Sequence, residues 1–194
     1  MDPKIVIITG GKNSGKSSFI KAFLNELCKA NLLVGGIYSP AVIKEGSKIA
    51  IDAVNISTSE RRQLAVFAPG WDAEMPLREW RFYNTVLQWG DRIIEKTIHD
   101  GNKFDVLIID EIGYLELEKN DGWTSVFNLT NNSDFLSTYM VIREGLLVAA
   151  KNIWLKSRIV PINSICNEKK WISREIKYLH SQKVSHTKRF QKRQ

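Results

Sequence analysis

The segment ITGGKNSGKSSF, residues 8–19, places three glycines and two lysines directly after a short apolar run. Residues 10–17 within it match the pattern G-x-x-x-x-G-K-[S/T]. Glycines at these positions let the backbone wrap around phosphate oxygens, and a helix that follows adds the positive end of its dipole. We expect Lys16 to reach the β- and γ-phosphates of a nucleotide and Ser17 to bind Mg²⁺. The expected nucleotide-binding residues are Gly10, Gly11, Lys12, Asn13, Ser14, Gly15, Lys16, Ser17 and Ser18.

A pair of carboxylates follows a second apolar run. The run FDVLIID, residues 104–110, has the pattern of a strand buried on both faces, and Asp110 and Glu111 stand at its end. Such a strand places a carboxylate at the sheet edge beside the phosphate-binding loop. We expect Asp110 to hold Mg²⁺ through water and Glu111 to act as general base on the attacking water. Arg143, at the end of YMVIRE, would either sense the γ-phosphate or pair with a neighbour such as Glu144.

The same carboxylates permit a second interpretation, because DEIG at residues 110–113 also fits the D-x-x-G pattern of small GTPases. Those switch proteins recognise guanine with N-K-x-D after a later strand. The candidate NEKK at residues 167–170 lacks the aspartate, and NNSD at residues 131–134 lacks the lysine and comes only 21 residues after Asp110. Neither candidate therefore supplies the element that gives a switch protein its base specificity.

Apolar runs alternate with helical periodicities along the chain, which predicts an α/β fold with a largely parallel sheet covered on both faces. The expected strands are residues 4–10, 32–46, 48–57, 63–67, 104–110, 138–144 and 158–163. The expected helices are residues 16–30, 77–99, 145–155 and 169–180. The turn-prone EGS at residues 45–47 predicts an antiparallel hairpin added at one edge of the sheet.

Three segments resemble a known family, the nucleoside-triphosphatases called cancer-related or thermophile NTPases. They are ITGGKNSGKSS, GGIYSPAVIKEGSKIAIDAV and, most specifically, IIDEIGYLEL. The resemblance implies a single P-loop NTPase domain with a RecA-like sheet and a catalytic glutamate beside the magnesium-binding aspartate. It also implies Mg²⁺-dependent hydrolysis of ATP, GTP and other nucleoside triphosphates to diphosphate and phosphate, with loose base preference.

The sequence departs from the family's motifs at three places. Lys48 stands where the family usually has arginine, and Ala50-Ile51 replaces its Gly-Phe. Near the end of the chain, NEK at residues 167–169 replaces a frequent N-R-D. We expect the contacts that these positions make with the nucleotide to differ. Glu116 matches a family position, but the sequence assigns it no role.

The charge of the chain is uneven. The formal net charge is +7, but the last twelve residues carry five of the 28 positive charges, so the rest of the chain has a net charge of only +2. We expect residues 183–194 to be a disordered basic tail, and the only segment through which nucleic acid would bind. Cys28 and Cys166 form no metal-binding or disulfide pattern, and no apolar run is long enough to span a membrane. We expect a cytoplasmic P-loop NTPase domain over residues 1–182.

Two alternatives to a nucleoside-triphosphatase remain from the sequence. The first is a nucleotide-gated binding or adaptor protein in which hydrolysis is incidental. The second is a small-molecule or nucleotide kinase, which is disfavoured because we find no arginine-rich lid to enclose a phosphoryl acceptor. Aromatic residues crowd positions 71–89, and we interpret them as core or as a partner groove rather than as a base-stacking lid.

Overall fold

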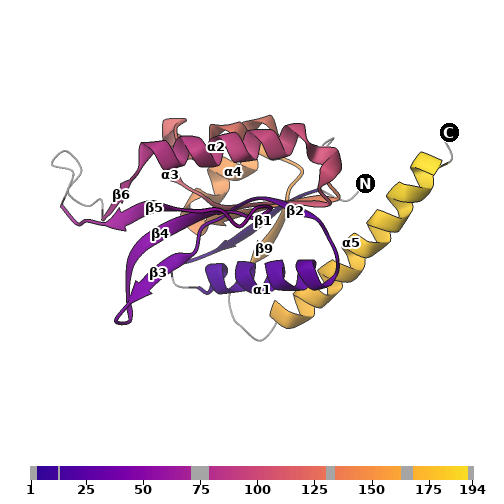
Figure 1. The fold of residues 1–194 in the computed structure, drawn as a ribbon, viewed down its shortest axis with the longest axis horizontal. Coiled ribbons are helices and arrows are strands. Elements are labelled where there is room, and N and C mark those ends of the chain that lie inside the picture. Colours follow the sequence, from indigo (N-terminus) through magenta and orange to yellow (C-terminus); the bar gives the residue numbers. More distant parts are fainter. Residues whose placement is uncertain (1–3, 13, 71–78, 130–133, 163–167, 192–194) are drawn as a thin grey trace.

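A nine-stranded sheet runs through the described part of the molecule, with helices on both of its faces (Figure 1). The computed structural model describes residues 4–12, 14–70, 79–129, 134–162 and 168–191, with side chains as far as residue 185. The expectations for Asn13, for Trp71, for residues 131–133 and for residues 163–167 lie outside these ranges.

Five parallel strands form one half of the sheet, in the order β2-β7-β8-β1-β9. They are β1 (Ile5–Gly10), β2 (Val34–Tyr38), β7 (Val106–Ile112), β8 (Ser137–Arg143) and β9 (Arg158–Pro161). Most of their residues are apolar and buried, as expected of parallel strands covered on both faces. Strand β8 lies between β1 and β7, so the strands that end at the glycine loop and at the carboxylates share one neighbour.

The other half of the sheet is antiparallel. Strand β4 (Ser47–Asn55) pairs antiparallel with β2, with β3 and with β5, and its residues Ala50 and Ile51 have partners in both β3 and β5. The remaining strands of this half are β3 (Ala41–Lys44), β5 (Arg61–Phe67) and β6 (Trp80–Phe82). The predicted hairpin is β3–β4, but the predicted strand over residues 32–46 is divided into β2 and β3 at Ser39 and Pro40. We call β3 to β6 the antiparallel extension.

Alternate residues of the buried strands face opposite layers of helices. On β1, Ile5 and Ile7 belong to one core cluster, whereas Val6 and Ile8 belong to a second. The first face is covered by α2 (Asn84–His99), α3 (Tyr114–Lys119) and α4 (Leu147–Ile153), and the second by α1 (Lys16–Lys29) and α5 (Glu168–Gln191) (Figure 1). Three short 3-10 helices are η1 (Gly101–Lys103), η2 (Thr124–Asn128) and η3 (Glu144–Leu146). The expected α/β fold with two helical layers is confirmed.

The helix expected over residues 77–99 is wrong at its beginning. Residues 80–82 form strand β6, which pairs with β5 with Phe67 opposite Trp80. The helix α2 begins only at Asn84, after Tyr83 in an extended conformation. Cross-strand packing favours a strand over a helix at residues 80–82, because the rings of Phe67 and Trp80 meet edge to face with centroids 5.5 Å apart. Trp89 is buried in the core, as expected for this aromatic segment.

Helix α5 is longer than predicted. Instead of ending near residue 180, its backbone remains helical to Gln191. The buried carboxylate of Glu175 accepts a hydrogen bond from the Tyr139 hydroxyl at 2.7 Å and pairs with Arg158, which anchors the helix to β8 and β9. Lys183 Nζ lies 2.7 Å from a carboxylate oxygen of Asp105. Once a helix is anchored, it can continue through polar residues of good helical propensity even where no apolar pattern exists. The end of α5 has no such pattern, so the sequence did not indicate the longer helix.

Of the helices in the described ranges, none combines the length and the apolar character that crossing a membrane requires.

Candidate active site

The glycine loop joins β1 directly to α1. Gly10 is the last residue of β1, and a Cβ atom placed on it would lie 2.5 Å from Ser14 Oγ and 2.9 Å from the Ile162 carbonyl oxygen. Gly15 precedes the helix with a φ of 93°, in the left-handed region that favours glycine. Close packing therefore requires a glycine at position 10, and the backbone conformation requires one at position 15.

The ammonium group of Lys16 lies back over this loop. Its Nζ donates hydrogen bonds to the carbonyl oxygens of Gly10 at 2.8 Å and of Gly11 at 2.7 Å. Ser17 and Ser18 are exposed in the first turn of α1. The structure thus gathers a positive charge and the N-terminus of a helix at the place where the sequence predicts phosphate binding.

The carboxylate of Asp110 is buried at the end of β7, with 2% of the residue exposed. Its Oδ2 accepts a hydrogen bond from the Ser39 backbone N–H at 3.2 Å, and the Ser39 hydroxyl donates to the Asp110 carbonyl oxygen. Burial and, after it, the charge of Glu111 raise the pKa of Asp110 to about 7, although the Ser39 bond, Lys48 and Lys16 act in the opposite direction. Sequence reasoning missed Ser39, because nothing local to it indicates that β2 lies beside β7.

Glu111 lies at an irregularity of β7. Asp110 is opposite Val141 of β8 and Ile112 is opposite Ile142, so Glu111 is an extra residue in this strand pair. Such bulges turn a side chain away from the regular alternation and are frequent beside active sites. The Glu111 carboxylate, which is about a third exposed, accepts a hydrogen bond from Arg143 Nε.

The pairing of the strands brings the three predicted groups to one edge of the sheet. Gly10 is opposite Arg143 in the β1–β8 pair, and Asp110 and Glu111 end the neighbouring strand on the other side of β8. Because these strands are parallel, their carboxyl ends lie together, which is where open α/β sheets bind ligands. Of the two interpretations of Arg143, the structure shows a pairing, but its partner is Glu111 rather than the expected neighbour Glu144.

The antiparallel extension also contributes charge to this edge. Lys12 Nζ of the glycine loop lies 3.8 Å from Glu79 Oε2, directly before β6. Lys48 of β4 holds its Nζ 4.8 Å from the centre of the Trp80 ring. Burial lowers the pKa of Lys48, Glu111 and Asp110 raise it in part, and Arg143 and Lys12 lower it. The sequence marked Lys48 only as a departure from the family's arginine, and its closeness to the carboxylates depends on strand pairing that the motif does not reveal.

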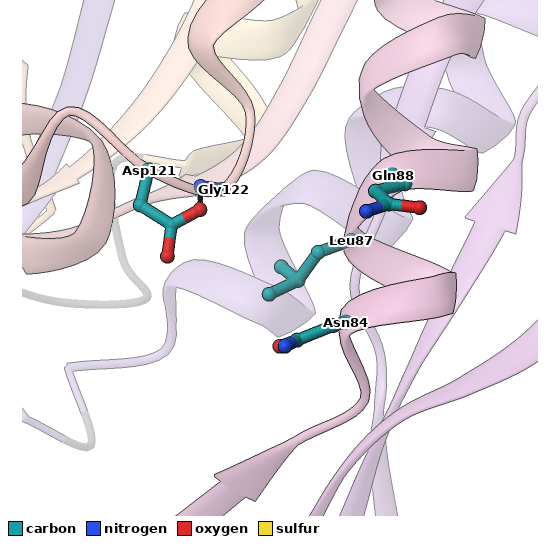
Figure 2. A pocket seen from close by; sticks show the side chains of 5 residues that line it. All are labelled: Asn84, Leu87, Gln88, Asp121 and Gly122. Atoms are coloured by element: carbon teal, nitrogen blue, oxygen red, sulfur yellow. Dashed lines mark hydrogen bonds between the residues drawn. The ribbon is translucent and has the colours of Figure 1, made fainter.

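Glu116 receives a structural role. Its Oε2 accepts from the Gly113 N–H at 2.8 Å and its Oε1 from the Trp123 N–H at 3.0 Å, so it closes the turn of α3. A pocket of about 100 Å³ lies nearby, between the first turns of α2 and the loop after α3. Figure 2 shows the residues that line it. Its lining residues are Asn84, Leu87, Gln88, Asp121 and Gly122. The pocket contains none of the predicted site residues.

The oxygen groups at the sheet edge are of the kind that Mg²⁺ prefers. No cluster of three or more histidine, cysteine or acidic side chains suited to a metal occurs among the described residues, so no preformed protein cage is present there. Mg²⁺ is usually held by one or two carboxylates together with the phosphates of its substrate. Asp110 fits this donor set, because burial disfavours its charged form and a bound cation would compensate for that cost.

Comparison with known proteins supports the assignment of the fold and the family. The family model described as NTPase matches residues 5–145. The nucleoside-triphosphatase THEP1 of Saccharolobus solfataricus is 37% identical over 114 residues, which are 58% of this chain and 62% of that protein. The nucleoside-triphosphatase THEP1 of Methanopyrus kandleri is 30% identical over 118 residues, which are 61% and 62% of the two chains. The chain thus spans about 62% of the length of the curated relatives that it matches.

Two solved structures share the fold. The crystal structure of THEP1 from Aquifex aeolicus superposes with a TM-score of 0.62 at 15% identity, over 87% of this chain and 97% of that one. The solution structure of a human cancer-related nucleoside triphosphatase superposes with a TM-score of 0.67 at 19% identity, over 92% and 98% of the two chains. At these identities the likeness is one of fold.

Proposed function

The chain belongs to the NTPase family, and from this premise we propose that it is a cytoplasmic, Mg²⁺-dependent nucleoside-triphosphatase that hydrolyses nucleoside triphosphates to diphosphate and phosphate. The observation that carries the proposal is the meeting of the glycine loop, Asp110 and Glu111 at one edge of the sheet. The names of the relatives agree with this activity.

The glycine loop binds the phosphates in this proposal. Lys16 exchanges its two carbonyl partners for oxygens of the β- and γ-phosphates, which bind an ammonium more strongly because they are charged. The backbone N–H groups of residues 10–18, including Asn13, and the first turn of α1 stabilise the remaining negative charge.

Ser17 and Asp110 would hold Mg²⁺ together with the phosphates. When bound there, Mg²⁺ supplies positive charge that screens the phosphate oxygens and the leaving diphosphate. Ser39 positions the aspartate, because its N–H and hydroxyl are bound to the side chain and to the carbonyl of Asp110. The position of Ser39 on the short connection between β2 and β3 ties this aspartate to the antiparallel extension.

Glu111 is the general base. It takes a proton from the attacking water while the water oxygen bonds to the γ-phosphorus. The bond from the γ-phosphorus to the bridging oxygen breaks, and its electrons remain on the diphosphate. Arg143 holds the carboxylate in one direction and lies beside Gly10, where it would also meet the γ-phosphate.

Base preference should be loose. The one N-K-x-D of the sequence, residues 102–105, lies directly before β7 and not after a later strand, where guanine-binding proteins use this motif. A site without buried base-specific hydrogen bonds discriminates between bases by only about 1.4 kcal/mol, or tenfold. We also propose that nucleic acid, if it binds at all, does so through the basic residues 183–194, and that no membrane partner is involved.

The test is a phosphate-release assay on ATP, GTP, CTP and UTP, with and without Mg²⁺, beside a nucleotide-binding titration. We expect Mg²⁺-dependent rates on the four substrates that agree within about tenfold. Strict dependence on GTP would restore the switch interpretation. Tight binding with a rate near that of the uncatalysed reaction would favour the adaptor, and transfer of phosphate to an added nucleoside monophosphate would favour the kinase.

A further inference from the structure

The antiparallel extension reaches the edge of the sheet where the candidate active site lies. Strand β4 pairs with β2 only at its end, where Asn55 is opposite Ile37 and Val54 is opposite Tyr38. The rest of β4, back to Ser47, therefore continues beyond the carboxyl end of β2. This is the end at which Ser39 contacts Asp110, and the Asp52 N–H is bound to the Pro40 carbonyl beside it at 3.0 Å.

Lys48 is carried at this projecting part of β4 and is held there by an aromatic ring. Its Nζ lies 4.8 Å from the centroid of Trp80, at a distance typical of a cation–π contact. The ring of Trp80 is fixed in turn by Phe67 on the neighbouring strand. Among the described side chains, Lys48 has no carboxylate within ion-pair distance, so its charge is positioned without being neutralised by direct contact.

The glycine loop contacts the same strand. Glu79, which directly precedes Trp80, pairs with Lys12 Nζ of the loop at 3.8 Å. The loop and Lys48 are thus both attached to the beginning of β6. The electrostatic neighbours of Lys48 include Glu111, Arg143, Asp110 and Lys12, all of them at the predicted site.

The other cations of the site are already engaged. Lys16 is bound to two carbonyls of the loop, and Arg143 is bound to Glu111. The charged neighbours of Lys48 include both carboxylates, Glu111 and Asp110, beside which the attacking water and the γ-phosphate would meet. Negative charge spreads over the γ-phosphoryl oxygens in the transition state, and a cation aimed at them lowers the barrier.

We propose that Lys48, held on Trp80, is a further catalytic residue that contacts the γ-phosphate of the bound nucleoside triphosphate from the antiparallel extension. The inference rests on the proposed hydrolase function, and it goes beyond that function by adding a cation from a part of the fold outside the glycine loop and the parallel strands. It also gives the antiparallel extension a role, because the beginning of β6 then connects the glycine loop to Lys48, which completes the phosphate site.

The test compares Lys48→Met, which keeps the aliphatic stem but removes the charge, with Lys48→Arg and with the control Lys44→Met. Lys44 is an exposed lysine at the end of β3 in the same extension. We expect Lys48→Met to lower kcat by about 10- to 100-fold. Its Kd for nucleoside diphosphate should stay within about threefold of the parent's, because the diphosphate lacks the γ-phosphate. Lys48→Arg should recover most of kcat, and Lys44→Met should behave as the parent.

A binding measurement keeps the inference testable without hydrolysis. A non-hydrolysable triphosphate analogue and the diphosphate are titrated into the parent and into Lys48→Met, and the ratio of the two affinities is compared. Lys48→Met should lose preference for the triphosphate by about tenfold, with an unchanged thermal midpoint. Trp80→Phe supplies a spectroscopic control. Because Lys48 Nζ lies over the Trp80 ring, a triphosphate that contacts Lys48 should change the tryptophan emission, and this change should shrink in Trp80→Phe.

The outcomes distinguish the inference about Lys48 from the proposed hydrolase function. A Lys48→Met variant with the parent's kcat and the parent's affinity ratio overturns the inference while leaving the hydrolase intact. An equal loss in Lys44→Met also overturns it, because the effect would then be one of overall charge. A parent that releases no phosphate contradicts the proposed function, and the affinity ratio then decides whether Lys48 contacts the γ-phosphate.

Discussion

Arg143 Nε donates a hydrogen bond to Glu111 Oε1 at 2.5 Å, across the neighbouring strands β8 and β7. The pair joins the residue proposed as general base to the strand that lies beside the glycine loop. An ion pair of this kind fixes the direction of a carboxylate, and its position beside Gly10 means that an incoming γ-phosphate would compete for the same guanidinium. Arg143 is therefore expected to affect catalysis through the position of Glu111.

Replacement of Arg143 by glutamine tests this relationship. The Arg143 side chain is 65% exposed, so we expect little change in the free energy of unfolding, less than about 1 kcal/mol. We expect kcat to fall by about tenfold or more, because Glu111 loses its orientation. In the double variant with Glu111→Gln the losses should not add, since both act on one proton transfer. Arg62→Gln, which breaks an exposed ion pair with Glu60, is the control. Additive losses would mean that the two residues act independently.

Replacement of Lys16 by alanine should abolish detectable hydrolysis and weaken triphosphate binding. The site loses its mobile positive charge against the β- and γ-phosphate oxygens, whereas the fold keeps the glycines that shape the loop. Phosphate release and nucleotide titration measure the two effects, and circular dichroism checks the fold. Normal hydrolysis by a folded Lys16→Ala variant would contradict the assignment of the phosphate-binding loop.

The features that the sequence predicted well are those determined by neighbouring residues. The position of the glycine loop between β1 and α1 follows from a few consecutive residues, and so does the place of Asp110 and Glu111 at the end of a buried strand. The buried apolar strands were visible because parallel strands covered on both faces need continuous apolar runs. The assignment of the family rested on the same short motifs.

The features that the sequence could not predict depend on which strands become neighbours. Ser39 meets Asp110 because β2 pairs with β7, and Arg143 meets Glu111 rather than Glu144 because β8 pairs with β7. Residues 80–82 form a strand because β5 offers a partner, although the predicted helix over residues 77–99 included them. Pairings between residues distant in sequence have no local signature, and they decide the surroundings of the site.

Glu175 should be a main anchor of α5. Its carboxylate is buried and binds both the Tyr139 hydroxyl and Arg158, so Glu175→Ala leaves two polar groups without their partner. We expect the free energy of unfolding in urea to fall by about 2 kcal/mol or more. Glu175→Gln should lose less, because the amide oxygen still accepts from Tyr139. Arg174→Ala, at an exposed position of the same helix, serves as the control, and an equal effect there would contradict the anchoring role.

Deletion of residues 183–194 should leave hydrolysis unchanged. It removes the ion pair of Lys183 with Asp105, which is partly exposed and contributes about 1 kcal/mol or less. It also removes five positive charges, so any binding to nucleic acid should weaken and lose part of its salt dependence. Retaining the length while replacing Lys188, Arg189, Lys192 and Arg193 by glutamine separates charge from helix length. Lost activity in the deletion would mean that the end of α5 supports the active site.

Asp110 and Glu111 should respond differently to neutral replacements, although they are adjacent. Glu111→Gln keeps the shape and a hydrogen-bonding group but loses the proton acceptor, so turnover should fall by about 10²- to 10⁴-fold. Nucleotide affinity should change little or even tighten, because a negative charge near the γ-phosphate is removed. Asp110→Asn should instead weaken Mg²⁺-dependent binding, since Asp110 is the buried carboxylate available to the cation.

The two variants are compared by measuring turnover and nucleotide affinity on folded protein over a range of Mg²⁺ concentrations. Added Mg²⁺ should recover part of the loss in Asp110→Asn, because the defect lies in the affinity for the cation. It should recover nothing in Glu111→Gln, where the site is filled but the water keeps its proton. Hydrolysis by Glu111→Gln at the parent's rate would show that another group accepts the proton, and equal recovery of both variants by Mg²⁺ would show that the two carboxylates share one role.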